Sequence, residues 1–321
     1  MKLRLKLPST LTRAAALLSF LAVGSAVAAS SSTAPKANVG FENAVRPISN
    51  PVYVDLPITQ TYLHPIFMYQ TLPNQVSVIG GKLPVKGDFQ LYALALEYAF
   101  NERFSFIASK DGYLDFNPDQ SFTKEEGWAN IAGGLKWAFY LNPEKQFASS
   151  VKLMVEVPTG NTDVFQGVGD GKVTPSISAF KLWNNFQFQG TIGGILPFDR
   201  DRESTMFFDS WHVSYRLFEK LFPMIELNHF HVLSAGDGKT QFGAQAGGGV
   251  PGIAKFEGGD LINLGASNST QNRDLVTIAL GCRFRVSESV DVGAAFELPL
   301  TKTSDNLMET RTTVDLVWRF M

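Results

Sequence analysis

The stretch VDLVWRF, residues 314–320, lies one residue short of the end of the chain and follows a two-residue repeat. One face of this repeat is apolar and carries two aromatic rings: Val314, Leu316, Trp318 and Phe320. Asp315 and Arg319 lie on the other face. Because successive side chains of a strand point to opposite sides of a sheet, the pattern predicts an amphipathic β-strand. Such a face can be buried by a soluble core or by a lipid bilayer.

The N-terminal segment has the three parts of a secretory signal peptide. An apolar run, residues 14–23, precedes a small-x-small cleavage site at Ala26-Val27-Ala28, and the run is too short for a transmembrane helix. The positive charges before or at the start of this run are Lys2, Arg4, Lys6 and Arg13. We therefore expect residues 1–28 to be a signal peptide that exports the chain, and we disfavour the alternative of an N-terminal membrane anchor.

Composition narrows the class of protein. No later stretch approaches the roughly 20 consecutive apolar residues of a spanning helix, so a membrane protein with this sequence must be a closed β-barrel. The formal net charge of -2 gives no indication of nucleic-acid binding. Cys282 is the single cysteine, which excludes an internal disulfide. No linker-like change in composition interrupts the chain, and we expect one barrel domain over residues 61–321.

From about residue 61 the sequence alternates between strand-like segments and turn residues. Each expected strand is long enough to cross a bilayer at a tilt, which takes about 9–11 residues. The expected strands number twelve: 61–70, 89–100, 103–115, 128–140, 147–158, 172–183, 186–197, 205–217, 221–233, 273–285, 289–300 and 308–320. The fold class is thus all-β, a transmembrane antiparallel up-and-down barrel.

The connections between these segments alternate in length. The short turns at 101–103, 142–146, 184–185, 218–220 and 287–289 are each followed, one strand later, by a longer polar loop. Bacterial outer-membrane barrels have short periplasmic turns at one end and longer extracellular loops at the other. A soluble sandwich with Greek-key connections has no reason to keep this alternation. Because twelve is an even number of strands, both termini of the barrel domain are expected on the periplasmic side.

Aromatic residues gather beside the short turns, as in the periplasmic aromatic girdle of a membrane barrel. These residues are Tyr98, Phe100, Phe104, Trp137, Phe139, Phe147, Trp183, Phe186, Tyr215, Phe222, Trp318 and Phe320. The opposite, inward faces of the strands carry intermixed charges of both signs. We expect the following to line the lumen and any transport path: Glu97, Lys136, Lys152, Glu156, Arg216, Glu226, Arg283, Arg285, Glu297, Arg311 and Asp315.

Two interpretations of the inward charges remain open. They could form a polar conduit for solutes and water, or pair with one another inside a filled lumen, since barrels of about eight strands are filled and those of 16–18 strands are open. Arg283, Arg285, Arg311 and Arg319 in particular could form a basic wall or a network of salt bridges.

The terminal strand resembles the signal that the barrel-assembly machinery of the outer membrane recognises, carried here by Val314, Leu316, Trp318 and Phe320. Met321 follows Phe320, where the usual signal ends on an aromatic residue. Four stretches also resemble a transporter-like outer-membrane barrel family associated with the meta-pathway of phenol degradation: 94–118, 155–163, 256–268 and 291–300. This resemblance implies passive passage of small, often aromatic or apolar molecules.

Two segments outside the strand pattern have open roles. Residues 29–60 could form a periplasmic arm or a plug that enters the barrel from below. The Gly-rich loop 234–272 is longer than a simple cap, and ordered loops of this length are usually functional or disordered. Its apolar part, DLINLGA, could fold into the barrel mouth, or the whole loop could be mobile and extracellular.

The histidines allow a test for enzyme chemistry. If the tight turn centres on Glu219, Asp209 lies opposite His229 on the hairpin 205–233, which is half of a hydrolase relay. Ser210 points the other way, so no serine completes it, and a hydrogen bond at the rim is the preferred interpretation. His229 and His231 share a face, but the sequence shows no third metal ligand. We predict no catalytic residues, metal or cofactor.

The sequence therefore predicts a monomeric or loosely oligomeric channel in the outer membrane of a Gram-negative bacterium. Its partners would be outer-membrane lipid, the assembly machinery and an unidentified small solute, with no nucleic acid. The rival hypotheses are a structural or surface-interaction barrel with a plugged lumen and a lipid-acting hydrolase.

Overall fold

The computed structural model describes residues 40–320. The expected signal peptide, residues 1–28, the first part of the expected arm or plug, residues 29–39, and Met321 lie outside the described residues. In the described part, no helix is long and apolar enough to cross a membrane.

Antiparallel strands dominate the described chain. Their bounds are β1 Tyr62–Thr71, β2 Gln75–Val78, β3 Gly81–Pro84, β4 Gly87–Ala99, β5 Phe104–Lys110, β6 Tyr113–Pro118, β7 Glu125–Trp128, β8 Ile131–Asn142, β9 Phe147–Val157, β10 Lys172–Trp183, β11 Phe186–Pro197, β12 Thr205–Tyr215, β13 Leu221–Ser234, β14 Asp274–Arg285, β15 Val290–Pro299 and β16 Thr310–Arg319. Short helices lie only in connections: η1 Thr162–Val164, η2 Gln245–Gly248, α2 Val250–Ile253, η3 Ser269–Gln271 and η4 Thr303–Asp305.

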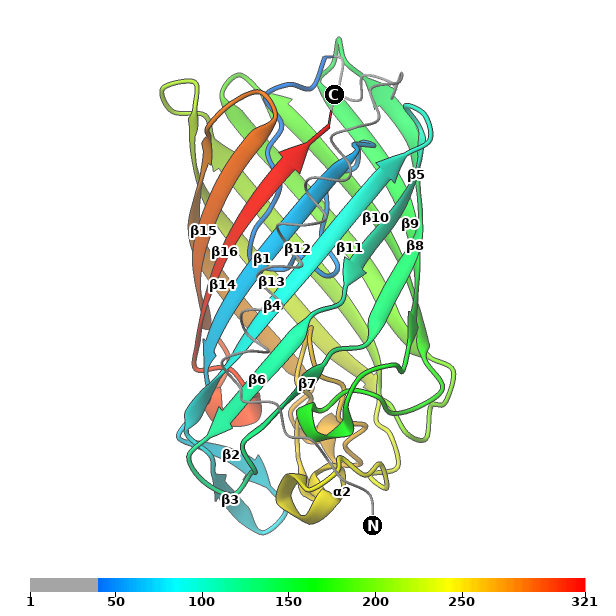
Figure 1. The fold of residues 1–321 in the computed structure, drawn as a ribbon, viewed down its shortest axis with the longest axis vertical. Helices are drawn as coiled ribbons and strands as arrows, with labels where there is room; N and C mark the ends of the chain where they lie inside the picture. Colours follow the sequence, from blue (N-terminus) through cyan, green and yellow to red (C-terminus); the bar gives the residue numbers. More distant parts are fainter. Residues whose placement is uncertain (1–39, 321) are drawn as a thin grey trace, which may run out of the picture. The chain divides into compact units, whose positions relative to one another are not determined.

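The large sheet closes into a barrel because β1 pairs with both β16 and β4 (Figure 1). Two of its strands are interrupted: β5 and β6 pair in succession with β4, and β7 and β8 continue beside them. Counting each interrupted strand once, the described chain forms the twelve-stranded antiparallel barrel that the sequence predicts. The β2–β3 hairpin, in the connection after β1, was not expected.

Short turns lie at one end of the barrel and long connections at the other, as the loop lengths predict (Figure 1). The end of β16 and the start of β1 lie at the short-turn end. We call the end of the barrel with the short turns the short-turn end and the opposite end the loop end.

Burial alternates along each strand with a period of two, which fixes the register of the barrel. On β13, Ile225 and Leu233 are exposed and Glu226, Asn228 and Phe230 are buried. On β16, Val314 is exposed and Asp315 buried. The outward face is therefore largely apolar, and the inward face is the one that carries most of the charges.

Most of the expected girdle aromatics face outward near the short-turn end, including Tyr98, Trp137 and Trp183. The prediction that Phe222 belongs to this outward-facing girdle is wrong. Its side chain is 2% exposed and packs inside the barrel against Val45 and Ile48. The alternation along β13 places Phe222 inward, on the face of Met224 and Glu226. It was assigned to the girdle only because it lies close to a short turn.

Two segments fill the barrel interior. Residues 41–60, which we call the hairpin plug, enter at the short-turn end, reverse direction near 50–54 and return to the start of β1; every residue from Ala44 to Gln60 is buried. Residues 235–273, the inserted loop, connect β13 to β14 and bury all of residues 259–266. Of the two alternatives left open for its apolar part, the structure therefore has the folded-in one.

Candidate functional site

The inward charges nearest the short-turn end hold the hairpin plug. Lys136 Nζ lies 2.7 Å from Asp55 Oδ2 of the plug and 2.8 Å from Glu97 Oε2 of the wall. Lys152 Nζ contacts the other oxygen, Asp55 Oδ1, at 2.6 Å, and donates to the carbonyl of Tyr53. All four charged side chains are buried. A buried charge is stable only when it is paired, so Asp55 fixes the depth at which the plug sits.

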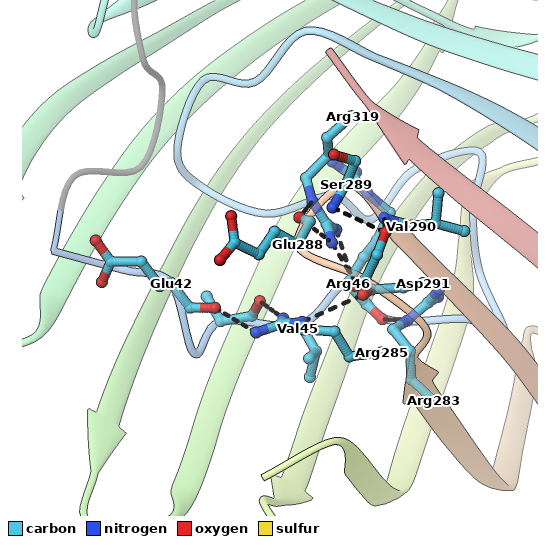
Figure 2. A network of polar contacts seen from close by, with 12 residues as sticks. Glu42, Val45, Arg46, Arg283, Arg285, Glu288, Ser289, Val290, Asp291 and Arg319 are labelled. Carbon is cyan, nitrogen blue, oxygen red and sulfur yellow. Dashed lines mark hydrogen bonds and ion pairs between the residues drawn. The ribbon is translucent and has the colours of Figure 1, made fainter. Parts of the chain in front are cut away.

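A second network lies on β14, β15 and β16, close to the short turns (Figure 2). Arg283, fully buried, makes a bidentate pair with Asp315 at 2.9 and 2.7 Å and donates from Nε to the carbonyl of Arg46 in the plug. Arg285 and Arg319 both contact Asp291, and Arg285 also donates to the carbonyl of Glu42. Of the two alternatives left open for Arg283, Arg285 and Arg319, the structure therefore has the salt-bridge network, which also binds the plug backbone.

Uncharged and acidic wall residues bind the plug backbone directly. Glu226 accepts hydrogen bonds from the amides of Ile48 and Ser49 at 2.9 and 2.7 Å, and contacts His212 Nδ1 at 2.8 Å. The Gln187 amide both accepts from the Val45 N–H and donates to the Val45 carbonyl, each at 2.8 Å. These contacts supply partners to backbone groups that have no sheet neighbour.

Nearer the loop end, a charged side chain of the barrel wall binds the inserted loop. Arg311 makes a bidentate pair with Asp260 of the loop at 2.7 and 2.9 Å, and Glu297 lies 3.6 Å from the same guanidinium. A separate chain of contacts runs from Lys110 to Glu156, Lys172 and Glu203.

The inserted loop is also held by a buried carboxylate of its own. Glu257 accepts hydrogen bonds from Ser204 Oγ at 2.6 Å and from the amides of Leu264 and Ala266 at 2.6 and 2.9 Å. Burial raises the pKa of Glu257 to about 7, against the lowering effect of these three hydrogen bonds and with a smaller raising contribution from Glu203. Asn263 adds two contacts to Ser204.

The hairpin plug and the inserted loop belong to one apolar cluster inside the barrel. Val52 and Tyr53 of the plug, and Leu261 and Ile262 of the loop, are members of this cluster. The Tyr53 ring stacks on Phe208 of β12 with centroids 4.9 Å apart. Cavities beside Val52, beside Ser49 and beside Asn43 have volumes of about 20, 10 and 60 Å³. Within residues 40–320, the plug and the inserted loop thus occupy most of the lumen.

The expected lumen-lining residues fall into two groups. Those buried inside the barrel are Glu97, Lys136, Lys152, Glu156, Glu226, Arg283, Glu297, Arg311 and Asp315. Arg285 and Arg216 are only partly buried. Arg216 lies beyond the end of β12, at the short-turn rim, where it donates to Asn43 of the plug and Asn185 of a turn. It borders the entrance and does not line the strand wall, because β12 ends at Tyr215.

The expected contact between Asp209 and His229 is confirmed, with His229 Nδ1 2.8 Å from Asp209 Oδ2 on the outward face. Ser210 is buried on the inward side and accepts from Asn50, as the strand alternation predicts. A further residue, Asp274, contacts both His229 and His231. Sequence analysis missed it because 43 residues separate Asp274 from His231, although the two face each other in the strand register.

Sequence analysis also missed Arg46, Asp55, Glu257 and Asp260. Each is a buried charge in a segment without strand periodicity. Isolated charges inside otherwise apolar stretches, such as Asp55 in VYVDLPI, are the signal that could have found them.

Comparison with known proteins agrees with this architecture. No family model matches the sequence, and no curated protein matches it. Among solved structures, an outer membrane channel, COG4313, from Pseudomonas putida F1 is 12% identical, with a TM-score of 0.56, over 86% of this chain and 100% of that chain. The NanC porin is 6% identical with a TM-score of 0.49, over 80% of this chain and 100% of that one. The chain thus has the fold of an outer-membrane channel barrel.

Proposed function

We propose that this protein is an outer-membrane channel whose lumen is closed by the hairpin plug and the inserted loop, and that displacement of these segments opens a path for small solutes. The observation that carries the proposal is the polarity of the contacts between the plug and the wall. Asp55 and several backbone groups of the plug, among them the carbonyl of Arg46 and the amide of Ile48, bind wall side chains that are themselves charged or polar.

Polar contacts suit a segment that leaves its site. Water can replace a protein partner at each hydrogen-bonding group, so the net contribution of such a bond to stability is only about 0.5–1.5 kcal/mol. A wall carrying Lys136, Lys152, Glu226 and Arg283 would remain hydrated after the plug withdrew. An apolar wall would instead expose a large hydrophobic surface.

In the open state the residues expected to line a transport path would line it, apart from Arg216, which borders its entrance. The solute class we favour is small molecules with aromatic or apolar character. Support comes from the inward apolar side chains toward the loop end, among them Phe89, Phe116, Phe208 and Phe230. A solute entering from the loop end would meet these rings before it reached the charges nearest the short-turn end, such as Lys136 and Arg283.

Location and assembly follow from the same features. The outward apolar face and the expected signal peptide, residues 1–28, support export to the outer membrane. Val314, Leu316 and Trp318 lie on the outward face of β16, where Val314 is 45% exposed, and Phe320 directly follows the strand. We propose that they present the assembly signal, with folding of Phe320→Ala by the assembly machinery slower than that of Thr312→Ala on the same face.

A filled lumen also supports the second candidate, a structural or surface-interaction barrel that never conducts. Planar-bilayer recordings separate the two. We expect discrete conductance that rises in a variant lacking residues 41–57 and rises again when residues 240–268 are also removed. Heat-dependent migration on SDS gels would verify that each variant is folded. Folded variants without discrete conductance, including the double deletion, would contradict the channel.

A further inference from the structure

Four ionisable side chains meet on the outward surface of the barrel, away from the lumen: Asp209, His229, His231 and Asp274. They come from β12, β13 and β14, which are neighbours in the sheet (Figure 1). In the strand register Asp209 pairs with His229, and His231 pairs with Asp274. All lie toward the loop end of their strands, and Asp274 is the first residue of β14.

The polar atoms of this cluster converge on one carboxylate oxygen. His229 Nε2 lies 2.9 Å and His231 Nδ1 2.7 Å from Asp274 Oδ1. The three ligand atoms lie within 4.8 Å of one another. The side chains are accessible: His229 is 27% exposed, His231 32% and Asp274 50%.

A second layer of contacts orients His229. Its Nδ1 lies 2.8 Å from Asp209 Oδ2, while the other Asp209 oxygen accepts a hydrogen bond from Trp211 Nε1 at 2.8 Å. Metal-binding histidines almost always donate their second ring N–H to a carboxylate or carbonyl in this way. With Nδ1 protonated toward Asp209, a neutral His229 presents the lone pair of Nε2 to Asp274.

This arrangement leaves a position that suits a cation. A neutral imidazole carries one N–H, so His229 can donate to both Asp209 and Asp274 only as an imidazolium. A divalent cation placed between His229 Nε2, His231 Nδ1 and Asp274 Oδ1 would satisfy all three atoms with neutral imidazoles. Ligand atoms of a tetrahedral site lie about 3.4 Å apart at zinc bond lengths, so the two distances between histidine nitrogen and Asp274 oxygen need to lengthen by about 0.5–0.7 Å.

The surroundings do not explain the cluster as ordinary surface polarity. The same outward face carries Phe207, Trp211, Ile225 and Leu233, which belong to the apolar surface of the barrel. Charged side chains on a lipid-facing surface are destabilising, and more so toward the middle of the bilayer than near the interface. Three strands nevertheless each place an ionisable group at this one point.

We propose that His229, His231 and Asp274 form a binding site for a transition-metal dication of the zinc class, with Asp209 as the residue that positions His229. Two imidazoles and one carboxylate favour such ions over Mg²⁺ and Ca²⁺, which prefer oxygen ligands. Three protein ligands leave a fourth position open to water or to an oxyanion at the outer surface.

The test uses the full barrel, purified in detergent and stripped of metal. Isothermal titration with Zn²⁺, and with Co²⁺ followed by its visible absorption, measures affinity and coordination. We expect one saturable Zn²⁺ site per chain. His229→Ala, His231→Ala and Asp274→Asn should each weaken binding by at least tenfold, and Asp209→Asn by about 10–100-fold.

The matched control is Asp237→Asn, an exposed carboxylate of the inserted loop outside the cluster, which should leave binding unchanged. Heat-dependent migration on SDS gels verifies folding of each variant. Binding that is unsaturable, that survives both histidine substitutions, or that is equally strong for Mg²⁺ would overturn the proposal. A Co²⁺ spectrum of octahedral type would contradict the tetrahedral coordination.

Discussion

The hairpin plug and the inserted loop close the same lumen by different means. The plug meets the wall through buried charges and backbone hydrogen bonds, with Asp55 between Lys136 and Lys152, and through apolar side chains such as Ile48 and Leu56. The loop contributes a buried segment, residues 261–266, that is apolar except for Asn263. It also contributes a carboxylate, Glu257, which accepts hydrogen bonds from two amides of the loop and from Ser204. The plug thus depends on charge pairs with the wall, whereas the loop combines one such pair, Asp260 with Arg311, with a carboxylate and an apolar cluster of its own.

This contrast makes the two segments sensitive to different perturbations. Removing the charge of Asp55 should free the plug, because Lys152 then lacks a counter-charge and Lys136 retains only Glu97. Deprotonation of Glu257 should loosen the inserted loop. The following predictions test each side of the contrast.

The largest effect is expected for Asp55→Ala. Removing one partner of a buried ion pair costs about 3–5 kcal/mol, because Lys136 and Lys152 keep their charges in a site closed to water. We expect residues 44–58 to exchange amide hydrogens far faster while strand amides stay protected. Asp119→Ala, at an exposed loop carboxylate, is the control. Unchanged protection of the plug in Asp55→Ala would show that charge pairing does not hold it.

A smaller effect is expected from pH, acting on the loop. The pKa of Glu257 is about 7 with the loop in place, against 4.5 in its ordinary state, so the docked loop binds more protons between these values. Docking is therefore strongest below about pH 4.5 and weakens as the pH rises to about 7, by about 3 kcal/mol in total. Hydrogen exchange of residues 257–266, corrected for intrinsic rates, measures this.

Glu257→Gln is the matched variant for that prediction, since it retains the side-chain length but cannot ionise. The loss of protection between pH 4.5 and 7 should disappear in this variant while the plug behaves as before. A pH profile that is identical in the two proteins would assign the effect to another group.

The smallest effect is expected for Gln187→Leu. This change leaves the N–H and carbonyl of Val45 without their partner inside the barrel, at about 1–3 kcal/mol. The plug should open about 5- to 150-fold more often, as measured by cleavage with a protease that does not cut the barrel. Gln90→Leu, on the outward face of β4, is the control. Equal cleavage of the two variants would exclude a role for this contact.

The barrel itself could be predicted from the sequence because its signals are local. Strands such as β16 show a strict two-residue repeat, and the alternation of loop lengths gives the topology without any long-range information. The inward direction of Lys136, Arg283 and Asp315 follows from the same repeat.

The partners of these side chains could not be predicted in the same way. Asp55 reaches Lys136 across 81 residues, and Asp260 reaches Arg311 across 51 residues. Both acids lie in segments without periodicity, so no repeat states which way they point. The sequence could show that the inward face is charged, but whether water or another part of the chain neutralises those charges depends on how non-periodic segments fold.

The central claim, that the hairpin plug must leave its site for the lumen to conduct, can be tested by tethering the plug to the wall. Ser49 Oγ of the plug lies 2.9 Å from Asn228 Nδ2 of β13. In a Cys282→Ser background, Ser49→Cys with Asn228→Cys can be bridged by oxidation or by a short bismaleimide. Single-channel recording should then show conductance lost in the bridged protein and restored when the disulfide is reduced, while each single-cysteine control conducts throughout. Equal conductance in the bridged and reduced protein would contradict the account.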